Sequence, residues 1–321
     1  MLITRLKEKK SVRNGRSSER IPYFCNVTYK QCLLMELREL KDRYVNPYTD
    51  FGFKKLFGSE MNKDLLISFI NSLLSGEEVV TDLTYLNTEH LGTGEADRKA
   101  VFDVYCQNEK GEKFLVEMQR GEQRFFKDRS IYYATFPIRE QGQKGEWNYE
   151  LKAVYIIGIL NFTFDETDDN YFHHEVKLMD RRTKDVFYDK LTFIYLEMPK
   201  FNKEEDELDG MFEKWLFVLR NLSRLMARPK ALQERIFTKL FEAAEIAKFT
   251  KKEYDAYEDS LKAYRDWKNT IETAEYKGRE EGRAEGLAEG LEKGRKEQAL
   301  DMARQMIADN MPIEQIVKYT H

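Results

Sequence analysis

The sequence predicts an α/β protein in which helices cover a mixed sheet and a mostly helical region follows. Three observations support this fold class. Apolar residues recur at helical spacing between Asp50 and Leu74. Strand-like apolar segments then alternate with one further helix as far as Met198. Beyond Glu204 the apolar pattern is helical almost to the end of the chain.

The elements follow in this order along the chain. Residues 50–74 predict two short helices with a break near Gly58, the second capped near Asn62. A strand-like stretch over 79–90 ends at Gly92 and Gly94, where the pattern breaks. The remaining expected elements are strands over 101–106 and 114–120, a helix over 125–141, a buried strand over 151–164 and a strand over 187–198.

The composition indicates a folded protein without a membrane span. Of the 321 residues 41% are hydrophobic and 13% aromatic, which is enough for a real core. The longest apolar stretch, Val154–Leu160, is too short to cross a bilayer. No apolar segment with a small-residue cleavage site follows the basic N-terminus, so secretion is disfavoured. Cys25, Cys32 and Cys106 form no CxxC pair, so we expect a cytoplasmic protein with reduced thiols.

The charge distribution distinguishes the N-terminus from the rest of the chain. The net charge of −4 does not by itself indicate nucleic-acid binding, which depends on a local basic face. Residues 1–43 contain eleven Lys and Arg against five Asp and Glu. We interpret residues 1–34 as a basic extension that is solvated and disordered. The alternative is that the natural start is Met35 and that residues 1–34 are not translated.

Two carboxylates stand inside apolar segments on either side of a short polar stretch. Asp103 lies within VFDVYC and Glu117 within FLVEMQR. The sequence Asn108-Glu109-Lys110-Gly111 between them is typical of a hairpin connection, which places the two acids on neighbouring strands. Burying two carboxylates side by side is costly unless a cation neutralises them. The pair therefore predicts a divalent metal site.

Two further residues are candidates for the same site. Gln119 follows Glu117 by two positions and faces the same side of a strand, where its amide could hold a water or a phosphate oxygen. Asp50 heads the first predicted helix, and its spacing alone favours an N-cap or turn role over that of a third acid. An edge strand with solvent-facing acids would have a similar pattern. The apolar residues flanking Asp103 and Glu117 favour the buried site.

The C-terminal segment has a four-residue glycine repeat. On an α-helix such a repeat forms one slowly drifting stripe, and each glycine costs roughly 1 kcal/mol of helix propensity relative to alanine. Two interpretations stand side by side, a coiled-coil-like oligomerising stalk and a flexible charged linker. Residues 303–319 add an apolar face, with Pro312 starting a last helix. The repeat consists of Gly278, Gly282, Gly286, Gly290 and Gly294.

Several separated motifs resemble the PD-(D/E)xK nuclease family transposases, which are related to the recombination-promoting nucleases. These motifs are NPYTDFGFKKLF over 46–57, Phe102-Asp103-Val104 and Val116-Glu117-Met118-Gln119, and the glycine repeat is also similar to members of that group. The resemblance covers roughly residues 40–300. It implies a restriction-endonuclease-like core and DNA cleavage dependent on Mg²⁺ or Mn²⁺.

The resemblance also implies roles for individual residues. Asp103 and Glu117 would bind the metal, and Asp50 becomes a plausible third acid. Gln119 stands where a lysine is usual, which leaves the site without that positive charge, although many relatives share the glutamine. On the helix over 125–141, the residues expected to contact the scissile phosphate or the DNA backbone are Lys127, Arg129 and Tyr132.

Alternative interpretations accompany these roles. Lys127 is also compatible with a solvated lysine and Tyr132 with a packing residue. His173 and His174 point to opposite faces of a strand, so we interpret them as surface residues rather than metal ligands. The chain has no glycine-rich GK[ST] loop, which disfavours an ATPase and a nucleotide cofactor.

We therefore expect a metal-dependent DNA endonuclease that is associated with recombination or mobile elements and forms homo-oligomers through its C-terminal helix. The alternative is a catalytically inactive protein with the nuclease fold that binds DNA or a partner chain. The expected organisation is an extension over 1–34, a nuclease-like domain over 35–203, a helical region over 204–275 and a stalk with its tail over 276–321.

Overall fold

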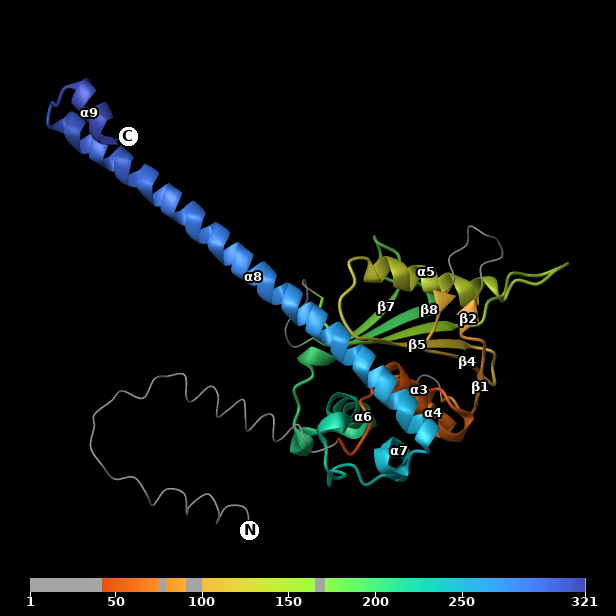
Figure 1. Ribbon diagram of the computed structural model, residues 1–321. Coiled ribbons are helices and arrows are strands. Elements are labelled where there is room, and N and C mark those ends of the chain that lie inside the picture. The colour runs from red at the N-terminus through yellow and green to blue at the C-terminus, as the bar shows by residue number, and fades with distance from the viewer. Residues whose placement is uncertain (1–41, 75–78, 91–99, 165–170, 321) are drawn as a thin grey trace, which may run out of the picture. The chain divides into compact units, whose positions relative to one another are not determined.

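A computed structural model describes residues 42–74, 79–90, 100–164 and 171–320 (Figure 1). Residues 44–321 form one compact unit. The predicted extension over 1–34 and the break at Gly92 and Gly94 lie outside the described residues. Within the described ranges, no helix combines the length and the apolar character that a membrane span requires.

A mixed sheet of six strands forms the centre of the unit. The strand order is β1-β4-β5-β6-β8-β7. The pairs β5–β6 and β6–β8 are parallel, and the other neighbours are antiparallel. The strands are β1 (Leu83–Tyr85), β4 (Val104–Asn108), β5 (Lys113–Gln119), β6 (Val154–Leu160), β7 (His173–Met179) and β8 (Val186–Glu197); a separate ladder pairs β2 (Glu89–His90) with β3 (Ala100–Val101).

Helices cover both faces of this sheet, which confirms the predicted α/β class. Helix α5 (Phe126–Arg139) lies on one face, and α3, α4, α6 and α7 lie on the other (Figure 1). The remaining helices are α3 (Asp50–Phe57), α4 (Lys63–Leu73), α6 (Gly210–Asn221), α7 (Arg235–Ala244), α8 (Lys251–Ala308) and α9 (Ile313–Thr320), with 3₁₀ turns η1 (Glu60–Asn62), η2 (Met198–Lys200), η3 (Glu205–Glu207), η4 (Leu222–Arg224) and η5 (Ile246–Lys248).

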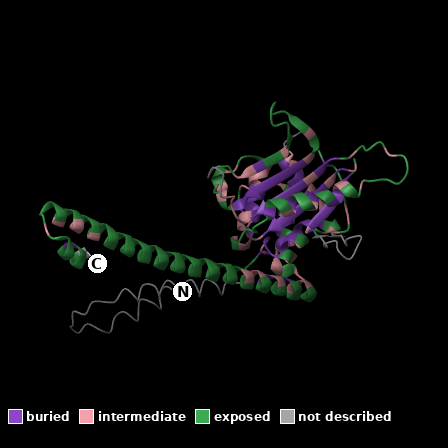
Figure 2. Ribbon diagram, turned by 90° about the horizontal axis from the view of Figure 1, so that it is seen from above, coloured by how far each residue is buried: buried purple, intermediate pink, exposed green. Residues whose placement is uncertain are grey.

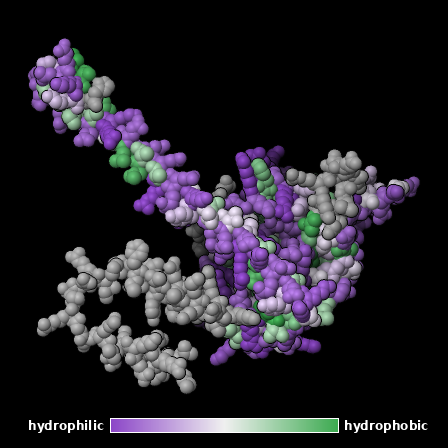
Figure 3. Space-filling model, viewed as in Figure 1, coloured by the Kyte–Doolittle hydropathy of each residue, from purple (hydrophilic) through white to green (hydrophobic). Residues whose placement is uncertain are grey.

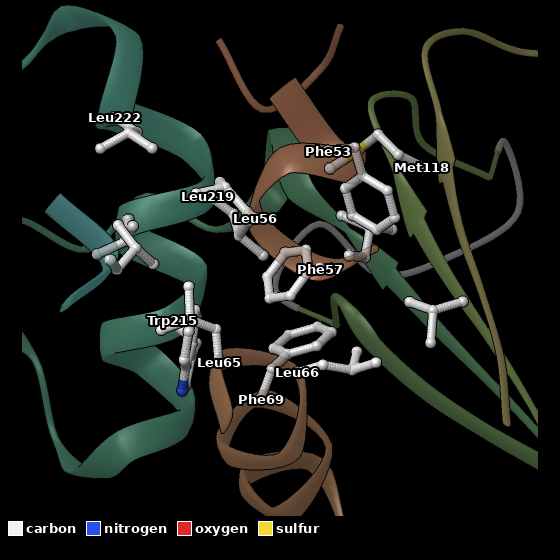
Figure 4. Packing of buried hydrophobic residues seen from close by; sticks show 14 of the residues in the cluster. Phe53, Leu56, Phe57, Leu65, Leu66, Phe69, Met118, Trp215, Leu219 and Leu222 are labelled. Carbon is white, nitrogen blue, oxygen red and sulfur yellow. The ribbon is translucent and has the colours of Figure 1, made fainter. Parts of the chain in front are cut away.

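The period-two alternation of β5 divides its side chains between two cores. Val116 and Met118 belong to the larger core, under α3, α4 and α6, whereas Leu115 belongs to the smaller core under α5. Figure 4 shows the larger core, where Phe53 of α3 lies beside Met118, and Phe57 of α3 packs against Phe69 of α4 and Trp215 of α6. Trp215 of α6 is fully buried there, and each buried aromatic or leucine side chain contributes roughly 1.5–3 kcal/mol.

The hairpin predicted between the two acidic segments is present. Asn108 ends β4, and its side-chain Oδ1 accepts hydrogen bonds from the backbone N–H of Lys110 and of Glu112, at 3.1 and 2.9 Å. Gly111 has a φ of +82°, in the left-handed region where a glycine carries no Cβ penalty. The turn therefore fixes the register between β4 and β5.

Most of the other predicted helices and strands are present, and their boundaries differ from the predicted ones by a few residues. The two N-terminal helices are α3 and α4, separated after Phe57, with Gly58 as the C-cap of α3 and Asn62 as the N-cap residue of α4. The helix over 125–141 is α5, and the strands over 151–164 and 187–198 are β6 and β8. The strand over 101–106 is an exception, because β3 ends at Val101 and β4 begins at Val104.

Helix α8 begins against α3 and continues away from it (Figure 1). Thr250 caps the helix, and Glu253 completes a capping box by accepting from the Thr250 backbone N–H at 2.9 Å. Beyond Trp267 the helix is almost entirely exposed (Figure 2). The glycine repeat is helical throughout, as the stalk interpretation requires, and its pairing with a second helix stays a prediction. Helix α9 follows Pro312, as predicted.

Candidate active site

A cleft of about 280 Å³ opens at the carboxyl end of β5. Ligand sites of open α/β sheets commonly lie at the carboxyl ends of their strands. The walls come from the start of α3, the end of β5, the loop that follows it, α5 and α8. Polar and charged side chains dominate the lining, and the predicted site residues among them are Asp50, Asp103, Glu117, Gln119 and Arg129.

Asp103 and Glu117 lie opposite each other at the end of the β4–β5 ladder. The register pairs Val104 with Val116, so the next residue outward on each chain, Asp103 and Glu117, faces the same side of the sheet. Asp103 itself is not in a strand, and the prediction of a continuous strand over 101–106 is wrong at this point. The backbone ladder stops at Val104, so the Asp103 carboxylate rather than a carbonyl accepts from the Met118 N–H, at 2.9 Å.

Glu117 is buried with one of its carboxylate oxygens unpaired. The residue is 7% exposed. Oε2 accepts a hydrogen bond from Gln119 Nε2 at 2.7 Å and lies 3.6 Å from Arg129 Nη2. Oε1 has no hydrogen-bond partner among the described residues. A buried polar atom without a partner is costly, so this oxygen marks a place where a ligand would be stabilising.

Both acids have raised pKa values, and the charge of Asp103 contributes to the shift of Glu117. Burial, followed by the charge of Asp103, raises the pKa of Glu117 to about 8, while Arg129 and the Gln119 hydrogen bond act in the opposite direction. Burial likewise raises the pKa of Asp103, the Met118 N–H opposes the shift, and the charge of Asp50 adds to it. A cation between the two carboxylates would remove both penalties.

The donor set fits a hard divalent ion that retains water ligands. Mg²⁺ is usually bound in proteins through one or two carboxylates and keeps several waters. Asp103 and Glu117 supply two such carboxylates, and the unpaired Glu117 Oε1 is a free ligand atom within the described part of the chain. The described ranges contain no group of three or more His, Cys, Asp or Glu side chains that could together hold a metal. The protein ligands would therefore number two, with water completing the shell.

Asp50 faces the same cleft from the start of α3. The N-cap interpretation of Asp50 is wrong, because Thr49 caps the helix through a hydrogen bond from the Gly52 N–H to its Oγ1, at 3.0 Å. Asp50 is the first helical residue and pairs with Lys54 at 2.9 Å. Gly52 is required here, since a Cβ would lie 2.1 Å from the Asn46 carbonyl oxygen. Because Thr49 is the cap, the Asp50 carboxylate is not used to cap the helix. The role of Asp50 as a third acid stays a prediction.

Arg129 provides a positive charge beside Glu117. The guanidinium comes from α5, donates to Gln123 Oε1 at 2.6 Å and stacks over the Tyr133 ring at 4.8 Å. The guanidinium therefore supplies a positive charge close to Glu117. Gln119, which lies beside Glu117 on the same face of β5, is neutral and supplies none. Sequence reasoning selected Arg129 as a phosphate contact and could not show that it reaches the carboxylate.

The other two residues predicted to bind DNA do not line the cleft. Lys127 Nζ lies over the Phe164 ring at 5.0 Å. Tyr132 is 43% exposed and packs edge-on against Phe136 at 5.2 Å between ring centroids. Both lie on the same helix as Arg129 but outside the cleft, so a contact with DNA backbone beyond the scissile phosphate stays a prediction for each.

His173 and His174 do lie on opposite sides of β7, but the surface interpretation of His174 is wrong. His174 is 9% exposed and its Nε2 lies 2.5 Å from Glu197 Oε1. Sequence reasoning also missed several residues of the cleft wall. These are Tyr48, Arg120, Gly121, Gln123 and Trp267. The sequence did not indicate that Trp267 belongs to the cleft, since it stands in a charged helical segment far along the chain from the two acids.

Residues 47–274, more than two thirds of the chain, match the family model described as PD-(D/E)XK nuclease family transposase. The chain belongs to this family. Neither a curated protein nor a solved structure gave a significant match. The matched segment contains every element that lines the cleft, including α8 as far as residue 274.

Membership of the PD-(D/E)XK nuclease family transposases confirms the resemblance noted in the sequence and identifies the fold. The mixed six-stranded sheet with helices on both faces and a long C-terminal helix is a restriction-endonuclease-like α/β fold. The family assigns the chain to nuclease-type enzymes, with DNA as the implied substrate and a connection to mobile elements. PD-(D/E)XK nucleases generally depend on divalent metals.

Proposed function

We propose that this protein is a DNA endonuclease that hydrolyses phosphodiester bonds with Mg²⁺, or Mn²⁺ in its place, during recombination or the movement of mobile elements. The observation that supports this proposal most strongly is the opposed pair of carboxylates, of which Glu117 is buried and Asp103 half-buried. Glu117 retains an unpaired buried oxygen and a pKa raised to about 8, both of which a divalent cation would relieve. Family membership supports the same reaction class.

Each residue of the cleft has a proposed role. Asp103 and Glu117 hold the metal, which when bound polarises the phosphate and lowers the pKa of a bound water. Gln119 donates to Glu117 Oε2, which fixes the rotamer of that carboxylate and leaves Oε1 for the ligand. Asp50, which also lines the cleft, is the proposed third acid and orients the attacking water.

Arg129 is the proposed phosphate-binding group. Gln119 is neutral, so a cationic side chain that would assist a bound metal in stabilising charge on the phosphate must come from another position. Arg129 Nη2 lies 3.6 Å from Glu117 Oε2, within reach of a phosphate bound at the carboxylate pair. Its contact with Gln123 and its stacking on Tyr133 hold the guanidinium in place before the substrate arrives. Lys127 and Tyr132 would contact the backbone further along the DNA.

Assembly through α8 is part of the proposal. Leu287 and Leu291 are 66% and 57% exposed and lie one turn apart beside the glycine stripe. Figure 3 shows apolar patches interrupting the hydrophilic surface of α8. We infer that the glycines allow close approach of a second copy of this helix and that the leucines are covered by it. The domain boundaries given from the sequence and a cytoplasmic location remain proposals of the same kind.

The test of the proposed activity uses supercoiled plasmid DNA. Purified protein should nick the plasmid with Mg²⁺ or Mn²⁺ and should not do so with EDTA. Mn²⁺ titration by calorimetry, without DNA, should give binding that Glu117→Gln weakens. Cleavage that persists in EDTA, or an unaltered Mn²⁺ affinity in Glu117→Gln, would contradict the metal site.

Two observations favour a second candidate function. Gln119 lacks the charge of a lysine, and the described part of the chain shows no three-ligand metal group. A catalytically inactive nuclease-fold protein that binds DNA or a partner chain would have these features. It predicts DNA retardation that is unaffected by Asp103→Ala and no cleavage with any metal.

A further inference from the structure

Trp267 of α8 forms part of the wall of the cleft that contains Asp103 and Glu117. Its indole lies directly against Gly121, two residues after the end of β5. A Cβ at Gly121 would come within 2.4 Å of the indole Cζ2, so a glycine is needed for the ring to occupy this place. The wall of the cleft is thus completed by a helix that lies outside the sheet layer.

The position of Trp267 is fixed by the first turns of α8. Tyr257 is 1% exposed, and its hydroxyl accepts from the Asn46 backbone N–H at 3.1 Å. Ser260 Oγ accepts from the Phe51 N–H at 3.1 Å. These bonds hold α8 to the start of α3, the same helix end that carries Asp50. Trp267 follows two turns after Ser260, on the cleft side of an anchored helix.

The surroundings of the ring match the chemistry of a site for unpaired nucleotides. The indole is partly exposed, and its neighbours in the cleft include Arg120 and Arg129. Sites for single-stranded nucleic acid combine cationic groups for the backbone with an aromatic ring on which a base stacks. In duplex DNA the faces of the bases are covered by their neighbours, so a ring at the cleft wall can reach a base only where pairing and stacking are broken.

We propose that Trp267 stacks on an unpaired base next to the scissile phosphate, so that the preferred substrate is single-stranded DNA. The inference rests on the proposed nuclease function, since it places the base relative to the acid pair. Arg129 would bind the phosphate while Trp267 holds the base on the other side of the same nucleotide. Gly121 keeps the ring within the cleft.

The test uses tryptophan fluorescence of the full chain in EDTA, where no cleavage occurs, with oligo-dT as the probe. The chain has three tryptophans. Trp215 is fully buried, and Trp147, which packs against Tyr149, is removed by Trp147→Phe. In this background oligo-dT should quench the fluorescence of Trp267. A duplex containing the same dT strand should quench it far less at the same ionic strength.

Variants at Trp267 give the second readout. Trp267→Leu should weaken oligo-dT binding by about tenfold to a hundredfold, the effect of removing one stacked base, and should change duplex binding little. Trp267→Phe should retain most of the affinity. Thermal unfolding of the parent protein, Trp267→Leu and Trp267→Phe in parallel establishes that the two variants are folded.

Three results would overturn the inference: equal quenching by duplex and oligo-dT, unchanged oligo-dT affinity in folded Trp267→Leu, or equal loss of affinity for both DNA forms. These results leave the nuclease proposal standing if the wild type nicks DNA with Mg²⁺. Conversely, quenching by oligo-dT in a protein that cleaves nothing supports the stacking site and contradicts the nuclease.

Discussion

The Asp103 carboxylate accepts a hydrogen bond of 2.9 Å from the backbone N–H of Met118, the residue that follows Glu117. This bond ties the segment between β3 and β4 to the end of β5. It holds Asp103 opposite Glu117 without any bound ion, since the Met118 N–H is a fixed donor near the end of β5. The two carboxylates are therefore brought together by the fold itself, at an electrostatic cost that appears in their raised pKa values.

The first prediction concerns the pH dependence of stability without metal. The pKa of Glu117 is raised from 4.5 to about 8, so between these values the folded state retains a proton that the unfolded state has lost. Stability should therefore fall as pH rises through this range. Glu117→Gln removes the part of this dependence that Glu117 causes and leaves the part that comes from the raised pKa of Asp103. In EDTA near pH 9, the Tm of Glu117→Gln should exceed that of the wild type by a few degrees. For a protein of this size, a change of ~1 kcal/mol in the free energy of unfolding shifts Tm by about 2–4 °C.

The control for this prediction is the same comparison at acidic pH. Near pH 5 the folded wild type carries a protonated Glu117, which resembles the glutamine in charge and shape, so the two Tm values should converge. A Tm difference of constant size from pH 5 to about pH 9 would mean that Glu117 does not titrate as its burial requires.

The second prediction concerns proton release on metal binding. A metal at the carboxylate pair requires both acids ionised, and near neutral pH Glu117 is largely protonated in the free protein. Mn²⁺ binding should therefore release close to one proton at neutral pH and fewer near pH 9. Calorimetry in two buffers of different ionisation enthalpy measures this number. Binding without proton release at neutral pH would place the metal elsewhere.

The third prediction concerns Arg129. Arg129→Met should lower Mg²⁺-dependent nicking by about 10²-fold, since it removes a preorganised positive charge from the site. It should also move the acidic limb of the pH–rate profile to higher pH, because Arg129 lowers the pKa of Glu117. Arg129→Lys should restore part of the rate.

The matched control for Arg129 lies on the same helix. Arg139 stacks over Phe136 at 5.7 Å and lines no part of the cleft, so Arg139→Met removes a similar cation and ring contact away from the acids. It should leave both the rate and the pH profile near those of the wild type. Equal losses in the two variants would indicate a general electrostatic effect on DNA binding.

The fourth prediction concerns the glycine repeat. No described atom lies within 4 Å of a Cβ placed at Gly278, Gly282, Gly286, Gly290 or Gly294. In an isolated helix, alanine at these positions would be stabilising by roughly 1 kcal/mol each. If a second helix approaches closely, the added methyl groups separate the pair. We expect the five-alanine variant, like deletion of residues 276–321, to have a lower mass in light scattering, and an unchanged mass would support a monomeric helix.

The sequence was sufficient for the fold class and for the acid pair because both depend on local patterns. Helical spacing over 50–74 and a turn at Asn108–Gly111 are short-range signals, and the turn alone fixes which residues of β4 and β5 oppose each other. The strand register then follows by counting residues outward from the turn. Asp103 and Glu117 can therefore be paired from their positions along the chain.

The remaining features depend on contacts between distant segments. The break before Val104 occurs because the Asp103 side chain replaces a backbone acceptor, which the apolar flanks of Asp103 do not indicate. Thr49 caps α3 in place of Asp50 because the turn from Asn46 to Thr49, closed by the Thr49 N–H on the Asn46 carbonyl oxygen, presents the Thr49 hydroxyl to the helix start. Trp267 reaches the cleft only because α8 is anchored on α3, a contact that no spacing along the chain encodes.

The most direct test of the central claim is the rate of nicking of supercoiled DNA by the wild type beside Asp103→Asn, with Mg²⁺ and with EDTA. The asparagine retains an oxygen for the Met118 N–H, so the fold should be kept while one negative metal ligand is lost. The wild type should nick with Mg²⁺ alone, and Asp103→Asn should be slower by roughly 10²-fold or more. Nicking by Asp103→Asn at the wild-type rate would contradict the assignment of the carboxylate pair as the catalytic centre.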